Sequence, residues 1–271
     1  MLPPMVVLVN PNTSAATTRM MTGIARRALA GTGLRVRGVT AAAGPPMLTD
    51  PAALRAAAPH VVAAAHQAVA GGDCAALIVA AFGDPGVPEL RAMPGPVPVP
   101  APGQLLVPVP VPGPVPASAS GPVPVPVPGP APGPVSVPVP TPVPVVGIGE
   151  AALAEAAAGG RRFGIATTTP RLAGSLDAQV ARLGLSSSYT GARFTTGAPE
   201  LLAARPESLL VALETAVRAC VVRDGAEAVV IGGGPLGEAA DALQSRLAVP
   251  VVAPIPAACR RIADALGVSG P

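Results

Sequence analysis

Four short turns combine small polar side chains with backbone N–H groups next to the expected start of a helix. They cover residues 10–14, 82–86, 167–169 and 232–234, and each follows a run of apolar residues. Such N–H groups attract a small anion, for example a carboxylate, or the polar edge of an imide. The same residue types also cap helices without binding any ligand. The turns therefore predict a site for a small molecule, with ordinary helix capping as the alternative.

Side chains that could support other chemistry are scarce. All 18 basic residues are arginine, which excludes an internal Schiff base with pyridoxal phosphate and a lysine-containing phosphate loop. His60 and His66 lie on different faces of a helix, so a metal pair is not expected. Cys74, Cys220 and Cys259 are far apart, have no metal-ligand spacing, and are typical of reduced thiols in a cytoplasmic protein. We expect no metal and no cofactor.

Composition also limits the partners. The net charge is only +3, the arginines are scattered and aromatic residues make up 1%, so nucleic-acid binding is not expected. Residues 1–9 do not form a signal peptide, and no apolar run of about 18 residues lacks proline, so a membrane partner is not expected either. Assembly into a homo-oligomer is left open.

One competing motif occurs late in the chain. Residues 232–237 fit the pattern G-x-G-x-x-G between a strand and a helix. A dinucleotide site would need an acidic residue at the end of the next strand to hold the ribose. That strand ends in Val-Ala-Pro-Ile at 252–255, without an acid. Dinucleotide binding is therefore disfavoured.

Apolar runs typical of strands alternate with patterns typical of helices. Strands are expected at residues 6–9, 34–39, 75–80, 145–148, 163–166, 229–231 and 249–253. Helices are expected at residues 15–30, 51–70, 88–93, 150–158, 171–183, 206–223, 238–247 and 257–266. Pro59 predicts a kink or a restart in the second of these helices. This alternation predicts parallel sheets covered on both faces.

Three blocks of sequence recur in the same order. The paired blocks are 6–13 with 163–170, 74–83 with 226–234, and 143–152 with 249–258. We therefore expect an α/β fold of two pseudo-symmetric lobes, each with a central, mainly parallel sheet flanked by helices, and a cleft between the lobes.

The repeat also suggests the domain boundaries. The first lobe is expected at residues 1–93, completed by residues 250–271, and the second at 145–249. Residues 94–144 hold 21 of the 38 prolines and no charged residue, which favours polyproline II. We interpret this insert as a disordered, solvent-exposed loop, and a ligand for a proline-recognising domain is the alternative.

Four motifs together resemble a known family. They are Asn-Pro-Asn-Thr-Ser at 10–14, Phe-Gly-Asp-Pro-Gly at 82–86, Val-Val-Gly-Ile-Gly-Glu-Ala-Ala at 145–152 and Ala-Thr-Thr at 166–168. This set is similar to the aspartate/glutamate/hydantoin racemase superfamily, in particular its hydantoin and allantoin racemase branch. The resemblance implies a racemase or epimerase that acts without pyridoxal phosphate on a hydantoin, allantoin or an amino-acid derivative. The substrate-binding residues it implies are Asn10, Thr13, Phe82, Gly83, Thr167, Thr168 and Gly234.

The chain departs from this family at the residues that transfer the proton. Family members use two cysteines, one per lobe, so that one thiolate removes a proton and the other thiol returns one from the opposite face. Ala81 and Gly233 occupy these two positions here. Cys220 and Cys259 fall within helices as core residues, and Cys74 begins its strand at the end remote from the turn. No intact catalytic pair is therefore expected.

Two functional hypotheses follow. The first is a racemase-family enzyme that acts on a small five-membered imide or an amino-acid derivative. The second is a relative of the racemases that binds such a ligand without turning it over. Asp84, Glu150 and Glu238 lie near the carboxyl ends of strands and could act as bases. For Asp84 and Glu150 the alternative interpretation is a structural role.

The loop interpretation of the insert predicts the effect of a deletion. Removal of residues 95–143 should leave the free energy of unfolding of the folded core nearly unchanged, because a long disordered loop adds only a small closure cost. Urea titrations of the full chain and the deletion variant measure this. A loss of several kcal/mol in the variant would contradict the interpretation.

Overall fold

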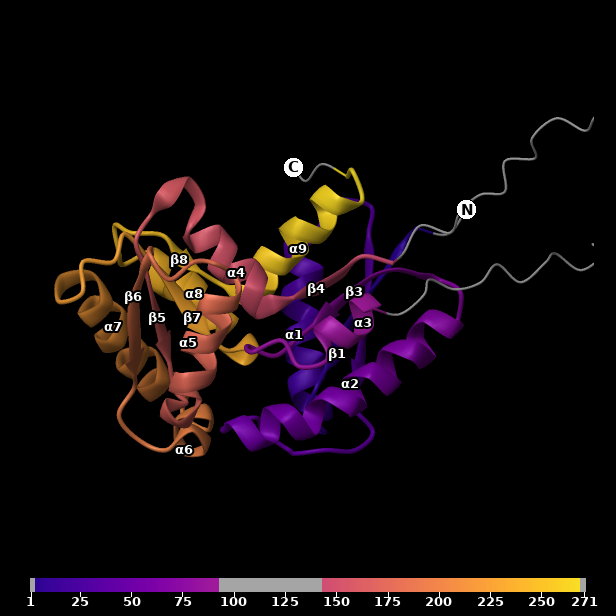
Figure 1. Ribbon diagram of the computed structural model, residues 1–271, viewed down its shortest axis with the longest axis horizontal. Coiled ribbons are helices and arrows are strands. Elements are labelled where there is room, and N and C mark those ends of the chain that lie inside the picture. The colour runs from indigo at the N-terminus through magenta and orange to yellow at the C-terminus, as the bar shows by residue number, and fades with distance from the viewer. Residues whose placement is uncertain (1–2, 93–142, 269–271) are drawn as a thin grey trace, which may run out of the picture. The chain divides into compact units, whose positions relative to one another are not determined.

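The computed structural model describes residues 3–92 and 143–268, which form two four-stranded parallel sheets (Figure 1). The first sheet has the order β2-β1-β3-β4 and the second the order β6-β5-β7-β8. The strands are β1 (Met5–Asn10), β2 (Arg35–Thr40), β3 (Cys74–Val79), β4 (Val145–Gly147), β5 (Phe163–Thr167), β6 (Tyr189–Phe194), β7 (Ala228–Gly232) and β8 (Val251–Val252). All pairs within both sheets are parallel, as expected from the alternation of strands and helices.

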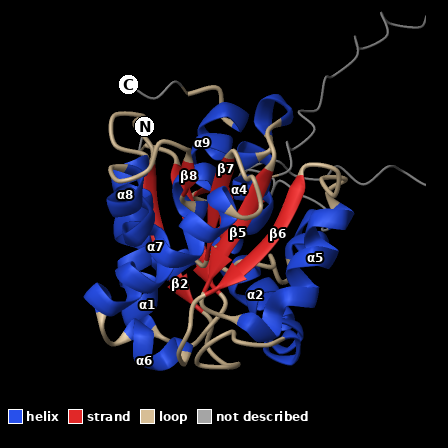
Figure 2. Cartoon of the chain, turned by 90° about the vertical axis from the view of Figure 1, so that its left-hand side faces the viewer, coloured by secondary structure: helices blue, strands red, loops and turns tan. Residues whose placement is uncertain are grey.

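Helices cover both faces of the sheets. In Figure 2 the strands of the second sheet run between α7 and α5. The helices are α1 (Ala15–Ala28), α2 (Pro51–Ala70), α3 (Val87–Ala92), α4 (Ile148–Ala156), α5 (Ala173–Arg182), α6 (Pro199–Ala203), α7 (Pro206–Val222), α8 (Gly237–Gln244) and α9 (Pro254–Ala265). Short 3-10 turns occur at Ala158–Gly160, Pro170–Leu172 and Gly234–Leu236. Within the described ranges, no helix combines the length and the apolar character needed to cross a membrane.

Alternation along the central strands separates the core into layers. Val6 and Leu8 of β1 pack in one hydrophobic cluster, whereas Val7 and Val9 pack in another on the opposite face. The same alternation divides β7 between two clusters. Because successive side chains of a strand point to opposite faces, a strand buried on both sides must be apolar throughout. This explains why the central strands read as uninterrupted apolar runs in the sequence.

The two sheets confirm the internal repeat. The order β2-β1-β3-β4 of the first sheet is repeated in the second sheet as β6-β5-β7-β8. In each sheet the strand that comes first in the sequence lies between the second and the third, and the fourth lies at the edge. Thus β1 corresponds to β5, β3 to β7 and β4 to β8, which are the three pairs of blocks that recur in the sequence. The fold class predicted from the sequence, an α/β protein with two similar parallel sheets, is therefore confirmed.

The strand pairing differs from the expected lobe boundaries at two places. The predicted boundaries place β4 in the second lobe and the segment 250–271 in the first, and of these only α9 packs against α1 of the first lobe as expected. Instead β4 pairs with β3 of the first sheet, and β8 pairs with β7 of the second. The crossover between the sheets therefore follows β4 rather than preceding it. Residues 94–142 of the expected insert lie outside the described residues.

Two elements were missed in the sequence and one was misjudged. The edge strand β6 is half-buried, so its residues need not all be apolar, and it contains Gly191 at a φ of 116°. It therefore lacks the uninterrupted apolar run that marks the central strands. The short helix α6 was also not expected. Helix α2 continues through Pro59 as one helix from Pro51 to Ala70, so no restart occurs there.

Candidate functional site

A cavity of about 330 Å³ lies at the carboxyl ends of strands from both sheets. The turns after β1, β3, β5 and β7 all contribute to its wall, as expected for ligand sites of parallel sheets. Its lining consists of Asn10, Asn12, Thr17, Met20, Met21, Met47, Leu48, Ala80, Ala81, Phe82, Thr168, Thr169, Leu172, Pro199, Ala203, Leu209 and residues 232–236. The cavity is the feature from which we build the candidate site.

The turn after β1 is fixed by the amide of Asn10. This side chain is fully buried, and its Nδ2 donates to Asn12 Oδ1 (2.8 Å) and Thr18 Oγ1 (2.9 Å). The backbone N–H of Asn12 donates back to Asn10 Oδ1 at 3.2 Å. Ser14 caps α1 by accepting from the N–H of Thr17. The hydrogen-bonding capacity of Asn10 is thus used to shape the turn, which places Asn12 and Thr17 at the cavity wall.

The wall from the second sheet is held by Thr167. Its hydroxyl donates to the carbonyl of Gly232 at 2.6 Å and so joins the ends of β5 and β7. The neighbouring Thr168 is mostly buried and lines the cavity, and its hydroxyl makes no hydrogen bond within the described part of the chain. The arrangement leaves this hydroxyl available to a ligand.

Residues with unpaired backbone N–H groups lie at the cavity wall in both repeats. Phe82 follows β3, whereas Gly233 and Gly234 follow β7, and all three line the cavity. None of their backbone N–H groups donates to an acceptor within residues 3–92 and 143–268. Unpaired N–H groups next to a buried cavity are costly unless water or a ligand accepts from them. They are therefore suited to the carbonyl oxygens of a bound molecule.

The structure separates the seven binding residues suggested by the sequence into two groups. Asn10, Phe82, Thr168 and Gly234 line the cavity. The other three, Thr13, Gly83 and Thr167, do not line it. Thr13 is exposed, and Thr167 hydrogen-bonds behind the wall. Gly83 adopts a φ of 109° and packs beside Leu54.

Sequence reasoning missed much of the lining. Asn12 lies in the turn after β1 and Thr17 lies in the first turn of α1. The argument that placed the turn at residues 10–14 near a ligand could also have predicted these two residues. The apolar part of the wall was not, because Met47, Pro199 and Leu209 come from segments that do not follow a strand of the site. Only the packing of those segments brings them to the cavity.

Ala81 and Gly233, the two positions at which the sequence resemblance implies cysteines, line the same cavity. Ala81 lies after β3 and Gly233 after β7, one in each repeat. Among the described lining residues, none is Asp, Glu, His, Cys or Arg, so no side chain there can transfer a proton near neutral pH. The cavity combines amide, hydroxyl and backbone hydrogen-bonding groups with apolar surface, and it is uncharged.

None of the three thiols reaches this cavity. Cys220 and Cys259 are fully buried in helices α7 and α9, and burial raises the pKa of each thiol to about 12. Cys74 begins β3, at the end of the strand opposite to Ala81, and its Sγ donates to the carbonyl of Ala76. Because only a thiolate is an effective base, these cysteines have structural roles.

Asp84 holds the turn that carries Ala81. Its φ of 52° is unusual for a residue with a side chain, and its carboxyl group is buried. The two oxygens accept from the backbone N–H groups of Gly149 (2.8 Å) and Glu150 (2.7 Å) and from Gln179 Nε2 (2.6 Å). The carboxyl group thus caps α4 and contacts α5, which is a structural role.

The other two acidic candidates also have partners away from the cavity. Glu150 forms a bidentate ion pair with Arg91 and accepts from the N–H of Gly147. Glu238 forms an exposed ion pair with Arg27 at 3.1 Å. Neither lines the cavity. Over the described ranges, no cluster of three or more His, Cys, Asp or Glu residues could hold a metal ion.

Comparison with known families identifies the scaffold. The sequence model of the Asp/Glu/Hydantoin racemase family matches residues 6–108 and 140–262, which is most of the chain. The chain therefore belongs to the Asp/Glu/hydantoin racemase family. A search of curated proteins found no match.

Solved structures of racemases share this fold. Allantoin racemase from Klebsiella pneumoniae superposes with a TM-score of 0.73 at 23% identity, over 98% of this chain and 89% of that one. Allantoin racemase from Pseudomonas fluorescens gives 0.72 at 22% identity, over 98% and 92%. A glutamate racemase from Francisella tularensis gives 0.56 at 9% identity, over 98% and 82%. At these identities the likeness concerns the fold.

The buried carboxyl group of Asp84 predicts a pH-dependent stability. Burial, opposed in part by the hydrogen bonds from Gly149 and Glu150, raises its pKa from 3.8 to about 7. The folded state thus favours the protonated carboxyl group. The contribution of Asp84 to the free energy of unfolding is fully present below about pH 4 and is lost as the pH rises through 7. We expect the free energy of unfolding to fall by about 4 kcal/mol over this range because of this group.

Urea denaturation between pH 4 and 8 tests this expectation. Asp84→Asn removes the titrating carboxyl group. The difference in the free energy of unfolding between the native chain and this variant, measured at each pH, therefore isolates the contribution of Asp84. Thr13→Val, at an exposed residue that carries no ionisable group, serves as the control and should leave the slope unchanged. A pH-independent difference between the native chain and Asp84→Asn would contradict the raised pKa.

Proposed function

We propose that this chain binds a small, uncharged cyclic imide or amide, of the hydantoin and allantoin type, in the cavity between the two sheets. The observation that carries the proposal is the lining itself, which offers amide, hydroxyl and backbone groups but no charged side chain among the described residues. Amino acids and dicarboxylates carry charges that this lining does not neutralise, and burying an unpaired charge is costly. A neutral ligand avoids that cost.

The chemistry of the wall is complementary to such a ligand. A five-membered imide ring presents alternating carbonyl and N–H groups along its edge. The unpaired N–H groups of Phe82, Gly233 and Gly234 suit its carbonyl oxygens, and the hydroxyl of Thr168 can accept from its N–H. Met20, Met47 and Leu48 supply apolar surface for the remaining face. The cavity volume of about 330 Å³ lies at the small end of ligand pockets, roughly 300–1,000 Å³.

Stereochemical inversion by two thiols is not part of the proposed function. Inversion needs a base on one face of the reacting carbon and an acid on the other. Ala81 and Gly233 occupy the positions from which thiols would act, and neither side chain carries a proton-transfer group. The backbone donors could still stabilise an enolate-like intermediate, but nothing in the described lining would remove the proton to form it. We therefore propose a binding protein built on a racemase scaffold.

Binding is tested by thermal unfolding of the full chain with racemic allantoin, hydantoin, glutamate or aspartate. We expect the two neutral ligands to raise the Tm and the two acidic amino acids to leave it unchanged, since a ligand stabilises the state that binds it. Thr168→Val should weaken the affinity about five- to tenfold, the typical effect of one lost hydrogen bond. Thr13→Val, at an exposed residue outside the cavity, is the matched control and should bind normally.

Proton NMR in deuterated water separates binding from catalysis. The native chain should not exchange the proton at the chiral carbon of allantoin or of a 5-substituted hydantoin above the rate without protein. Exchange at an enzymatic rate would overturn the non-catalytic assignment and establish a racemase that works without the two thiols. A Tm shift with glutamate or aspartate alone would overturn the ligand class.

Restoring both thiols should create proton exchange. The double variant Ala81→Cys, Gly233→Cys would place one thiol on each side of the bound ring. Gly233 has a φ of 152°, and a Cβ there would lie 3.1 Å from Leu236 Cδ1, so Leu236 must shift. We expect a loss of stability of about 1 kcal/mol from this position, together with a gain of exchange that either single variant lacks.

The matched control for this gain is the double variant Ala81→Ser, Gly233→Ser. It carries the same backbone strain and similar side-chain volume, but its hydroxyls do not ionise near neutral pH. The serine variant should therefore remain inactive in the same NMR assay. If the cysteine variant folds and binds allantoin yet exchanges no proton, the two positions do not flank the ligand as proposed.

A further inference from the structure

The ends of β3 and β7 approach each other closely at the central cavity. A Cβ placed on Gly234 would lie 3.3 Å from the carbonyl oxygen of Ala80 and 2.7 Å from Met21 Sδ. Bare backbone after β7 therefore packs against the end of β3 and against α1 of the first repeat. Ala81 follows Ala80 and Gly233 precedes Gly234, so these two positions flank the contact, and both line the cavity.

Chain geometry limits the distance between the two positions. The 3.3 Å contact, standard bond lengths and the spacing of neighbouring Cα atoms together place the Cα atoms of Ala81 and Gly233 at most about 11 Å apart. A substituent on a ligand carbon reaches about 5 Å, which is one C–C bond plus a van der Waals contact. One carbon atom between the two positions can therefore contact both of them through one substituent on each side.

Both positions carry the smallest side chains and have apolar surroundings. Ala81 contributes one methyl group to the wall, and Gly233 contributes only backbone. Beside Gly233 lies Leu236, whose Cδ1 would be 3.1 Å from a Cβ placed on the glycine, and Leu236 also lines the cavity. A ligand group next to either position thus meets hydrocarbon. Such surroundings favour alkyl substituents, because a polar group would lose its hydrogen bonds to water there.

The cavity volume exceeds the needs of an unsubstituted ring. About 330 Å³ is the share of roughly eleven water molecules in the liquid, at about 30 Å³ each. A hydantoin ring with its two carbonyl oxygens has only seven non-hydrogen atoms. Space that a ligand leaves unfilled forfeits van der Waals contacts, so a ligand with added substituents is favoured.

The chemistry of the lining agrees with a fully substituted carbon. Among the described lining residues, no side chain can transfer a proton near neutral pH. A ring carbon that bears two alkyl groups has no hydrogen to remove, so its recognition requires no such side chain. Size and chemistry of the wall thus indicate the same kind of ligand.

Building on the proposed function, we infer that the cavity is selective for a cyclic imide whose ring carbon bears two small alkyl groups, one directed toward Ala81 and one toward Gly233. The chemical class is a 5,5-dialkylhydantoin. Its carbonyl groups still accept from the backbone N–H groups of Phe82 and Gly234 at the cavity wall. The two substituents add apolar contacts at the two small positions.

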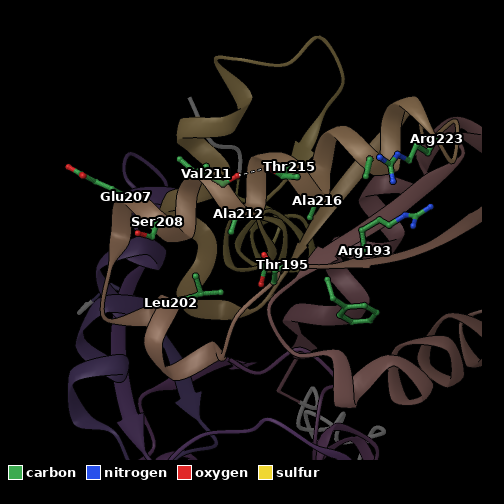
Figure 3. A pocket seen from close by; sticks show the side chains of 13 residues that line it. Arg193, Thr195, Leu202, Glu207, Ser208, Val211, Ala212, Thr215, Ala216 and Arg223 are labelled. Carbon is green, nitrogen blue, oxygen red and sulfur yellow. Dashed lines mark hydrogen bonds between the residues drawn. The ribbon is translucent and has the colours of Figure 1, made fainter.

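The larger cavity between α7 and the end of β6 differs in chemistry. It has a volume of about 740 Å³, and the charged residues Arg193, Glu207 and Arg223 contribute to its wall (Figure 3). An alkyl-substituted imide gains little from charged groups, so this ligand class is matched to the central cavity. Ala212 lines the larger cavity and is absent from the central lining, so it provides a position for a control variant.

Calorimetric titration of the full chain with hydantoin and with 5,5-dimethylhydantoin tests the inference. We expect the dimethyl compound to bind about tenfold more tightly, since each buried methyl group contributes about fourfold. If hydantoin binds and the dimethyl compound binds equally or more weakly, the inference is overturned while the proposed function stands. If neither compound binds, the proposed function fails together with the inference.

The two enantiomers of 5-methylhydantoin assign the faces of the ring. The native chain should bind both with similar affinity, because each places its methyl group at one of the two small positions. Ala81→Val should weaken the dimethyl compound and one enantiomer by about tenfold through overpacking, and should affect the other enantiomer much less. Gly233→Ala should show the opposite preference.

Ala212→Val introduces the same change of side chain in the larger cavity and should leave all of these affinity ratios as in the native chain. Circular dichroism of each variant establishes that it is folded before titration, and the native titrations decide the inference where a variant does not fold. If both substitutions weaken the two enantiomers equally, Ala81 and Gly233 do not lie on opposite faces of the ring, and the inference is wrong.

Discussion

The buried carboxyl group of Asp84 is the interaction on which the arrangement of the cavity depends. It accepts hydrogen bonds from the first turn of α4 and from Gln179 of α5, so it links the turn after β3 to the second repeat. Ala81 and Phe82 lie in that turn, and their positions follow from this anchor. The cost of burying the group is visible in its raised pKa, which shows that the link is maintained against desolvation.

Glycine accommodates this anchor where any side chain would collide with it. A Cβ at Gly147 would lie 2.2 Å from the carboxyl carbon of Asp84, and one at Gly149 would lie 2.5 Å from Gln179 Nε2. The strand β4 and the start of α4 therefore approach Asp84 through bare backbone. This close approach lets a helix N-terminus and a carboxyl group meet inside the core, an arrangement that helix dipoles and unpaired N–H groups favour.

The chain keeps the scaffold of a racemase while its cavity lacks proton-transfer groups. The family match extends over both repeats, and the strand order is the same in each. The cavity wall nevertheless has Ala81 after β3 and Gly233 after β7, and its described lining is uncharged. Binding and acid–base catalysis are separable, because recognition uses the turn backbone and nearby hydroxyls whereas catalysis needs two particular side chains. The proposed ligand class follows from the groups that remain.

Some features of the structure could be predicted from the sequence, and others could not. The apolar runs of β1, β3, β5 and β7 are readable because strands buried on both faces must be apolar throughout. The edge strand β6 was not predicted, because it is half-buried and contains Gly191 in a left-handed conformation. Strand β4 was assigned to the wrong sheet, since a three-residue strand gives no sign of its neighbour.

By itself, the sequence determined the α/β class, the internal repeat and the turns at the carboxyl ends of the strands. These features depend on local spacing and on the alternation of apolar and polar residues, which are visible along the chain. Only the tertiary structure decided that Thr168 faces the cavity while Thr167 lies behind it, and that Met47 and Leu209 complete the wall. Such positions depend on which segments pack together across the two sheets, and no local pattern encodes that choice.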